Sequence, residues 1–365
     1  MKIRLSIIIG LFCLMILTTL ILWRSSFMTQ QQRPRLVFHK SITYGADVPM
    51  RAELTMTWRR HGITHATQAH AILGSRGCYR MEYIAPVEAK GRIVYSDGKT
   101  QWQCEPRRNL LATTNLLPET AQNERDTEDL IVQNYRLVLV SEEETIAGRP
   151  VFLLELLPRH DGKSSQKRWI DKQTFRTLRI ETHYPDGILA RMVAYTAVTL
   201  PAKVVASDFV PQPSLTLQRV TTPLTSNILP MYKAMVKTTD NAKDKDGNRP
   251  DPVPVRSLGL RPEGALGFLL TQVASSSVEH SQTAHLLYSD GIETISVFVQ
   301  NGDSPALANA PGWHLISIQH HKAFENLDGH LDAVLWTQDG HRYTAVSYLG
   351  PKALQQFVGS QLQNE

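Results

Sequence analysis

The chain has 365 residues, a length that suits about two domains of ordinary size. Hydrophobic residues make up 42% and charged residues 20%, which is typical of a folded protein and argues against a largely disordered one. The formal net charge of +5 is spread along the sequence without a block of consecutive Lys and Arg, so nothing in the composition favours a nucleic-acid-binding protein.

The N-terminus predicts a membrane anchor at residues 1–28. Lys2 and Arg4 precede the uncharged run Leu5–Trp23, whose 19 residues would span about 28 Å as a helix, close to the thickness of a hydrocarbon core. A cleaved signal peptide is the alternative, but the run ends in Leu22-Trp23-Arg24 without small residues for cleavage. The positive charges before the run favour a cytoplasmic N-terminus, which places the rest of the chain outside the cytoplasm.

Short runs of alternating apolar and polar residues predict an antiparallel β domain over residues 36–215. We expect about nine strands in one curved sheet that wraps towards a barrel, with one or two helices covering it. One helix is expected from Pro118–Asp129; it either continues through Leu130–Leu139 or gives way to a strand at Tyr135–Val140. The other expected strands are Arg51–Trp58, His65–Leu73, Cys78–Ile84, Gly91–Tyr95, Thr100–Cys104, Val151–Leu157, Gln166–Asp171, Thr177–Tyr184 and Arg191–Leu200.

Large apolar side chains recur at strand spacing and are expected to share the interior of this sheet. Such a stripe is usually a packed core, and it becomes a lipid pocket only where it is left unfilled. The candidate lipid-pocket residues are Leu54, Met56, Trp58, Met81, Tyr83, Trp102, Leu154, Leu156, Trp169 and Ile180.

A charged, Pro-rich stretch within residues 216–256 predicts a linker, and a second domain follows at residues 257–365. Its expected strands include Trp313–His321, and its last element is an amphipathic helix at Pro351–Leu362. The whole chain is therefore expected to be α+β and mainly β: an anchor helix, an unclosed antiparallel barrel with helices, and a small α+β domain.

The sequence offers little for catalysis or metal binding. His61, His65 and His70 scatter along an extended segment, and Asp244-Lys245-Asp246-Gly247 lacks the last carboxylate of a calcium loop. We therefore predict no enzyme activity, no cofactor and no metal site. A disulfide between Cys78 and Cys104 requires strong twist or an unexpected strand order, because a simple meander leaves two strand spacings between them; the pairing is left open.

Several segments together resemble the MucB/RseB family, whose N-terminal domain is similar to the LolA/LolB lipoprotein carriers. In the first domain they are YRMEYIAP (Tyr79–Pro86), RIVYSDGKTQWQCEP (Arg92–Pro106), AGRPVFLLEL (Ala147–Leu156), KRWIDKQTF (Lys167–Phe175) and LRIETHYPDGIL (Leu178–Leu189). In the second domain HLLYSDGIETISVFV (His285–Val299) resembles the family's C-terminal domain.

The resemblance implies an unclosed, LolA-like half-barrel that can hold acyl chains, and a second domain that helps to bind an anti-sigma factor. We therefore expect a regulator of an envelope-stress sigma factor pathway, held in the inner membrane by residues 5–23 with its folded domains in the periplasm. Its expected partners are the anti-sigma factor and lipid or lipopolysaccharide. A lipid or lipoprotein carrier is the first alternative, and an envelope scaffold without either ligand is the second. The retained anchor and the long linker depart from the usual family pattern.

Overall fold

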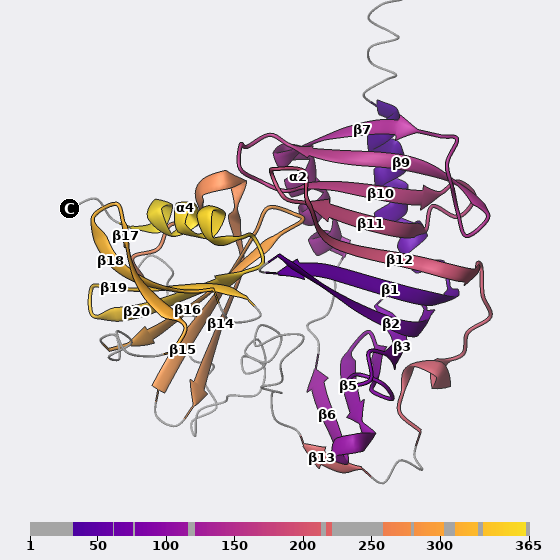
Figure 1. Ribbon diagram of the computed structural model, residues 1–365, viewed down its shortest axis with the longest axis horizontal. Coiled ribbons are helices and arrows are strands. Elements are labelled where there is room, and N and C mark those ends of the chain that lie inside the picture. Colours follow the sequence, from indigo (N-terminus) through magenta and orange to yellow (C-terminus); the bar gives the residue numbers. More distant parts are fainter. Residues whose placement is uncertain are drawn as a thin grey trace, which may run out of the picture.

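The computed structural model describes residues 32–60, 62–75, 77–115, 121–212, 217–220, 258–278, 281–302, 311–327 and 331–362. These residues form two sheets with no strand pairing between them (Figure 1). We call residues 32–220 the N-terminal unit and residues 258–362 the C-terminal unit. The anchor predicted at residues 1–28 lies outside the described residues. Of the helices that the structure describes, none combines the length and the apolar content needed to cross a bilayer.

The N-terminal unit is built on a 13-stranded sheet in the order β13-β6-β5-β4-β3-β2-β1-β12-β11-β10-β9-β7, with β8 paired to β9. All of its strand pairs are antiparallel except β13 with β6. The strands are β1 (Met50–Arg60), β2 (Ile63–Leu73), β3 (Cys78–Ala85), β4 (Ile93–Asp97), β5 (Thr100–Glu105), β6 (Leu110–Asn115), β7 (Tyr135–Ser141), β8 (Thr145–Ile146), β9 (Arg149–Pro158), β10 (Ser165–Asp171), β11 (Thr177–His183), β12 (Leu189–Thr199) and β13 (Gln218–Val220).

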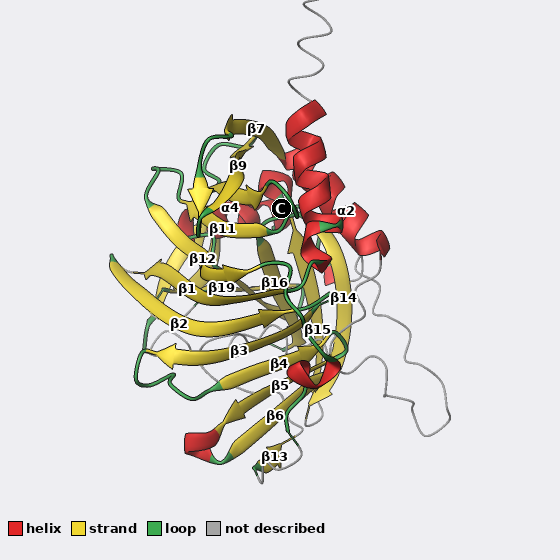
Figure 2. Cartoon of the chain, turned by 90° about the vertical axis from the view of Figure 1, so that its right-hand side faces the viewer, coloured by secondary structure: helices red, strands yellow, loops and turns green. Residues whose placement is uncertain are grey.

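This sheet is open in the part of the chain that the structure describes, because β13 and β7 end the strand order without pairing to each other. Two helices, at residues 32–43 and in α2 (Ala121–Asn134), cover its β7–β11 end, as Figure 2 shows. Phe38 of the first helix and Ile131 of α2 pack with Leu154 and Leu156 of β9 in one buried cluster. The expectation of a mainly β, unclosed sheet partly covered by helices is confirmed. Short 3-10 helices lie at Gly45–Asp47, Pro106–Arg108, Ala206–Phe209 and, in the C-terminal unit, Ala265–Gly267.

The sequence left open where α2 ends, and the structure places its end at Asn134, directly before β7. The first sheet also continues beyond the predicted domain limit at residue 215. After β12 the chain makes contacts near β1 and β3, where Arg51 bonds Asp208 at 2.7 Å and the Phe209 ring lies against Gly74. It then adds β13, which falls within the predicted linker 216–256.

The C-terminal unit is a seven-stranded antiparallel sheet in the order β14-β15-β16-β20-β19-β18-β17, with helix α4 (Pro351–Gln361) on one face. Its core contains Tyr288 and Phe268, which meet Phe357 of α4 edge to face with ring centroids 5.0 and 5.9 Å away. The strands are β14 (Leu269–Val278), β15 (Ser281–Ser289), β16 (Thr294–Asn301), β17 (Trp313–Ile318), β18 (His321–Asn326), β19 (Asp332–Gln338) and β20 (His341–Ser347).

One expected strand of this unit is wrong. Trp313–His321 is not continuous: it ends at Ile318, and His321 begins the antiparallel partner strand β18. Gln319 and His320 form the turn with φ values of 48° and 70°. Positive φ at both central residues is typical of a type I′ hairpin turn, which usually contains Asn-Gly or Gly. This turn contains neither, so no residue pattern marks it.

Candidate functional site: an apolar sheet face and the joint between the units

The strand register places eight of the ten candidate lipid-pocket residues on one face of the first sheet. Arg168 of β10 lies opposite both Leu154 and Ile180, and Val193 of β12 lies opposite both Ile180 and Met56. Directly paired residues share a face, and alternate residues of a strand do too. The pairing of β1 with β2 and of β2 with β3 extends this face by the same rule. The eight residues, which we call the apolar face, are Leu54, Met56, Trp58, Met81, Tyr83, Leu154, Leu156 and Ile180.

The apolar face is closed at one end and half-exposed in its middle. Leu154 and Leu156 are fully buried beneath the two helices. Met56 and Met81 are only partly buried, where they pack beside Tyr83. Figure 2 shows the curved strands β1 to β5 continuing beyond the end of the sheet that α2 covers. The half-exposed middle is the part of this face that could accept an apolar ligand.

Trp102 and Trp169 do not belong to this face, so the expected single interior is wrong for these two residues. Trp102 lies opposite Tyr95, whereas Met81 lies opposite Val94, the neighbour of Tyr95 in β4. Neighbouring residues of a strand point to opposite faces. By the same argument Trp169 lies opposite Leu153 rather than Leu154, and its indole N–H donates to Glu144 at 2.6 Å.

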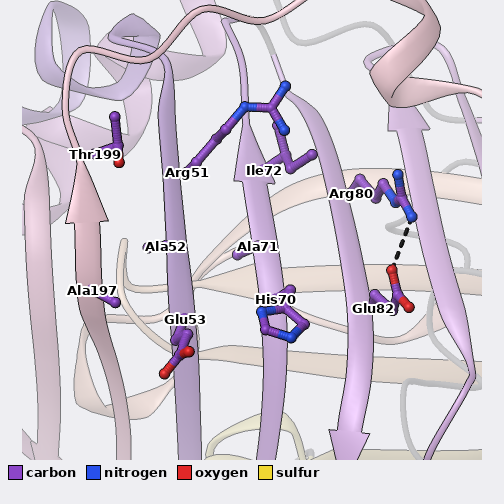
Figure 3. Close-up of a pocket in the computed structure, with 10 residues that line it drawn as sticks. All are labelled: Arg51, Ala52, Glu53, His70, Ala71, Ile72, Arg80, Glu82, Ala197 and Thr199. Atoms are coloured by element: carbon purple, nitrogen blue, oxygen red, sulfur yellow. Dashed lines mark hydrogen bonds and ion pairs between the residues drawn. The ribbon is translucent and has the colours of Figure 1, made fainter.

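The other face of β1 to β3 carries a charged trough of about 380 Å³ (Figure 3). Glu53, His70 and Glu82 lie opposite one another on the three neighbouring strands, one position away from the apolar residues. Arg80 bonds Glu82 at 2.9 Å, and Arg51 lines the end of the trough. Its charged side chains make this trough unsuited to an acyl chain.

The sequence left the pairing of Cys78 and Cys104 open, and in the structure both thiols are free. Cys78 pairs with Asp97 at one end of β4, whereas Cys104 pairs with Ile93 at the other end. Four residues of strand separate these positions by roughly 13 Å, and two strand spacings add to that distance. A disulfide needs Cα atoms within about 7 Å. Burial raises the pKa of the Cys104 thiol to about 11, which keeps it protonated near neutral pH.

Among the described residues, no group of three or more His, Cys, Asp and Glu side chains could hold a metal ion. His61 lies outside the described residues. His65 stacks on Trp58 with ring centroids 5.5 Å apart, and His70 lies five positions further along β2, so the two imidazoles point to opposite faces. The absence of catalysis stays a prediction.

The structure adds a site that the sequence did not predict, where the turn between β15 and β16 meets α2 and β7. Asp290 of this turn is fully buried. Its Oδ1 accepts hydrogen bonds from the backbone N–H groups of Ile292 and Glu293, at 2.8 and 2.7 Å. Its Oδ2 accepts one from the Tyr135 hydroxyl at 2.8 Å and another from the Lys163 ammonium. One carboxylate therefore stabilises its own turn and binds the other unit.

Lys163 comes from the N-terminal unit, and its side chain has no solvent exposure. Besides Asp290 it donates to the Leu266 carbonyl at 3.0 Å, and its ammonium lies 5.0 and 4.8 Å from the ring centroids of Tyr135 and Phe268. Burial lowers the pKa of Lys163, and the attraction of Asp290 offsets only part of that shift. A buried ammonium with these partners is stabilised only while the two units remain in contact.

The Asn134 side chain and the Gly291 backbone also bring the two units into close contact. The Asn134 amide, at the end of α2, donates to the carbonyls of Gly267 and Asp290 at 3.1 and 3.2 Å. A Cβ atom on Gly291 would lie 2.5 Å from Ile131 Cγ1 and 2.8 Å from the Ile131 nitrogen. Gly291 also has a φ of 96°. Only glycine allows this turn to approach the helix so closely.

Apolar and charged contacts extend the same interface. Ile292 packs against the buried cluster beneath the two helices of the N-terminal unit. Arg191 of β12 bonds Glu293 at 2.9 Å, and Arg60 at the end of β1 lies 3.7 Å from Asp332. Burial raises the pKa of Glu293, and Arg191 opposes that rise. We call the contacts of residues 289–293 with Ile131, Asn134, Tyr135 and Lys163 the joint.

The profile of the MucB/RseB N-terminal domain matches residues 93–213. No curated protein matches the sequence significantly. The structure of the Pseudomonas aeruginosa MucA/MucB complex matches over 91% of this chain and 98% of that chain, with 18% identity and a TM-score of 0.52. That likeness shows the fold alone, over both units.

Two further structures are less similar. MucB in complex with the segment called MucA(peri) covers 90% of this chain and 97% of that chain at 18% identity, with a TM-score of 0.48. A LolA superfamily protein from Nitrosomonas europaea covers 50% of this chain and 98% of that one at 12% identity, with a TM-score of 0.24. The profile match confirms, for residues 93–213, the resemblance to the MucB/RseB family that the sequence shows.

Proposed function

We propose that this protein is an extracytoplasmic, membrane-tethered regulator of an envelope-stress sigma factor pathway, and that it binds the anti-sigma factor of that pathway. The observation that carries the proposal is the fold of the MucA/MucB structure, which extends over both units and 91% of this chain. It is supported by the family match at residues 93–213. The joint holds the two units together, so a partner would meet a surface to which both contribute.

Binding of the protein partner is tested by titrating the full chain with the extracytoplasmic segment of an anti-sigma factor from the same organism. Isothermal titration calorimetry should show saturable binding, and a scrambled segment of equal composition should show none. Equal heats for the two segments would overturn the proposal.

We propose in addition that the half-exposed middle of the apolar face holds an acyl chain. Met56 and Thr55 are neighbours in β1, both partly buried, and they point to opposite faces of the sheet. Met56→Glu places a carboxylate on the apolar face, whereas Thr55→Glu places the same group on the opposite face. Native mass spectrometry with lipid extraction should find acyl lipid on the wild type and on Thr55→Glu, and much less on Met56→Glu.

Equal lipid on both variants would move the lipid site away from this face, and a lipid-free wild type would remove lipid from the proposal. Bound lipid without any binding of the anti-sigma segment would instead favour the second candidate, a lipid or lipoprotein carrier of the cell envelope. The half-exposed row of Met56, Met81 and Ile180 is the observation in favour of that candidate.

The tether is proposed from residues 5–23, which lie outside the described residues. The intact mass of the purified protein distinguishes a retained anchor from a cleaved signal. An alkaline carbonate wash of membranes should leave the full chain in the pellet and release a variant that lacks residues 1–28. Protease added to spheroplasts should digest the folded units if they lie in the periplasm.

A further inference from the structure

The joint connects the C-terminal unit to a helix that also covers the apolar face. α2 packs onto the sheet through Ile131, and Tyr135 follows directly after the helix; both belong to the buried cluster with Leu154 and Leu156. The same two residues contact the turn of the C-terminal unit, Ile131 through Gly291 and Tyr135 through Asp290. One short segment is thus shared by two interfaces.

Close contacts join α2 to the turn of the C-terminal unit. A Cβ atom on Gly291 would lie 3.1 Å from the Thr127 carbonyl oxygen and 2.8 Å from the Ile131 nitrogen, so the turn lies directly against the helix backbone over one turn. At the end of α2, Asn134 donates to the backbone of Gly267 and Asp290 in the C-terminal unit. Displacing α2 from the sheet would break these hydrogen bonds and the close contact with Gly291.

We propose that α2 and the turn at residues 289–293 move as one element, so that the C-terminal unit holds α2 closed over its end of the apolar face. Undocking of the C-terminal unit then releases α2, and anything that lifts α2 undocks the C-terminal unit. Two discrete arrangements follow, docked with α2 closed and undocked with α2 released, because the buried ion pair and the packed cluster are lost together rather than gradually. This coupling does not rest on the proposed function, since it concerns only contacts within the chain.

The test is hydrogen–deuterium exchange of the full chain, followed by mass spectrometry of peptides covering residues 127–134 of α2, residues 286–295 of the turn and residues 151–157 of β9. Tyr135→Phe keeps the ring in the cluster and removes the hydroxyl that donates to Asp290. Asp290→Asn keeps an oxygen for the turn and removes the charge that Lys163 pairs with. Loss of a hydrogen bond to a charged group should accelerate exchange by about tenfold or more in Tyr135→Phe, and further in Asp290→Asn.

The expected result is equal acceleration in the α2 and turn peptides, with β9 unchanged. Ser347→Ala is the matched control, because its buried hydroxyl bonds the Thr294 carbonyl at 2.9 Å, next to the turn but without contact to α2. This variant should leave the α2 peptide at the wild-type rate. The proposal is overturned if the turn accelerates while α2 keeps its wild-type rate, or if neither peptide changes. Tyr135→Phe decides the question if Asp290→Asn does not fold.

Discussion

The buried pair of Lys163 and Asp290 makes a quantitative prediction about stability. Both side chains have zero exposure, so removing either one leaves the other buried with an uncompensated charge. Breaking such a pair costs about 3–5 kcal/mol, so we expect a loss of about 4 kcal/mol for Lys163→Met and for Asp290→Asn. The ion pair of Arg33 and Glu142 is the comparison, because its side chains are 54% and 33% exposed. Arg33→Gln should cost less than about 1 kcal/mol.

The double variant Lys163→Met with Asp290→Asn measures the interaction energy between the two side chains. It removes both charges and leaves the Tyr135 hydroxyl an amide oxygen to donate to. The stability that the double variant loses should therefore be smaller, by roughly 2 kcal/mol or more, than the sum of the losses in the two single variants. Urea denaturation of the full chain, followed by circular dichroism, gives the free energies from the midpoint and slope of each transition.

The size of the loss also has an upper limit set by the structure. The pair joins two units with separate cores, so breaking it cannot remove more stability than their docking provides. If docking is lost, unfolding should separate into two transitions, one for each sheet. The reasoning fails if both single variants unfold in one transition with losses below about 1 kcal/mol, or if the single losses are simply additive.

Three further predictions concern other parts of the molecule. In thermal denaturation, Gly291→Ala should destabilise the protein by about 2 kcal/mol more than Gly302→Ala. Both glycines have positive φ, but only at position 291 would a Cβ atom lie against α2. Equal losses of stability in the two variants would contradict the close contact. Burial lowers the pKa of His285 from 6.5 to about 4, so the folded state favours the neutral ring. The free energy of unfolding should therefore be highest above pH 6.5 and fall by up to roughly 3 kcal/mol as the pH drops to about 4. His285→Phe should flatten this pH dependence in urea titrations. Cys78 and Cys104 should both react with a thiol reagent in the unfolded, non-reduced protein, and a reductant should leave the unfolding midpoint unchanged.

Local patterns in the sequence were sufficient for most of the secondary structure. Alternation in Arg51–Trp58 predicts β1, and the turn at Ser96-Asp97-Gly98 predicts the hairpin of β4 and β5. The reason is visible in the turn itself: Asp97 Oδ1 accepts the backbone N–H groups of Lys99 and Thr100 at 2.9 and 2.7 Å. Such contacts join residues that are close together in the chain, so the local sequence is sufficient to predict them.

Features set by distant residues were not accessible in this way. Trp102 has the size and spacing of an interior residue, but its face depends on which residue of β4 it pairs with, and a shift of one position reverses the outcome. Ser289-Asp290-Gly291 is a typical hairpin-turn sequence, so the place of Asp290 in a turn follows from its neighbours. Its second oxygen binds Tyr135, 155 positions earlier in the chain, and no local pattern carries that information.

The large sequence separation in the joint imposes an order on assembly. Asn134, Tyr135 and Lys163 lie in the N-terminal unit, whose described strands all precede residue 221, whereas Asp290 belongs to a hairpin that is synthesised later. The N-terminal unit can therefore complete its strand pairing first, while the Lys163 amine is still exposed to water and reactive. Arrival of the β15–β16 hairpin then removes that amine from solvent. Brief acetylation during refolding, quenched at successive times, should modify Lys163 only in molecules whose second half has not yet arrived, so this single lysine records the last step of maturation.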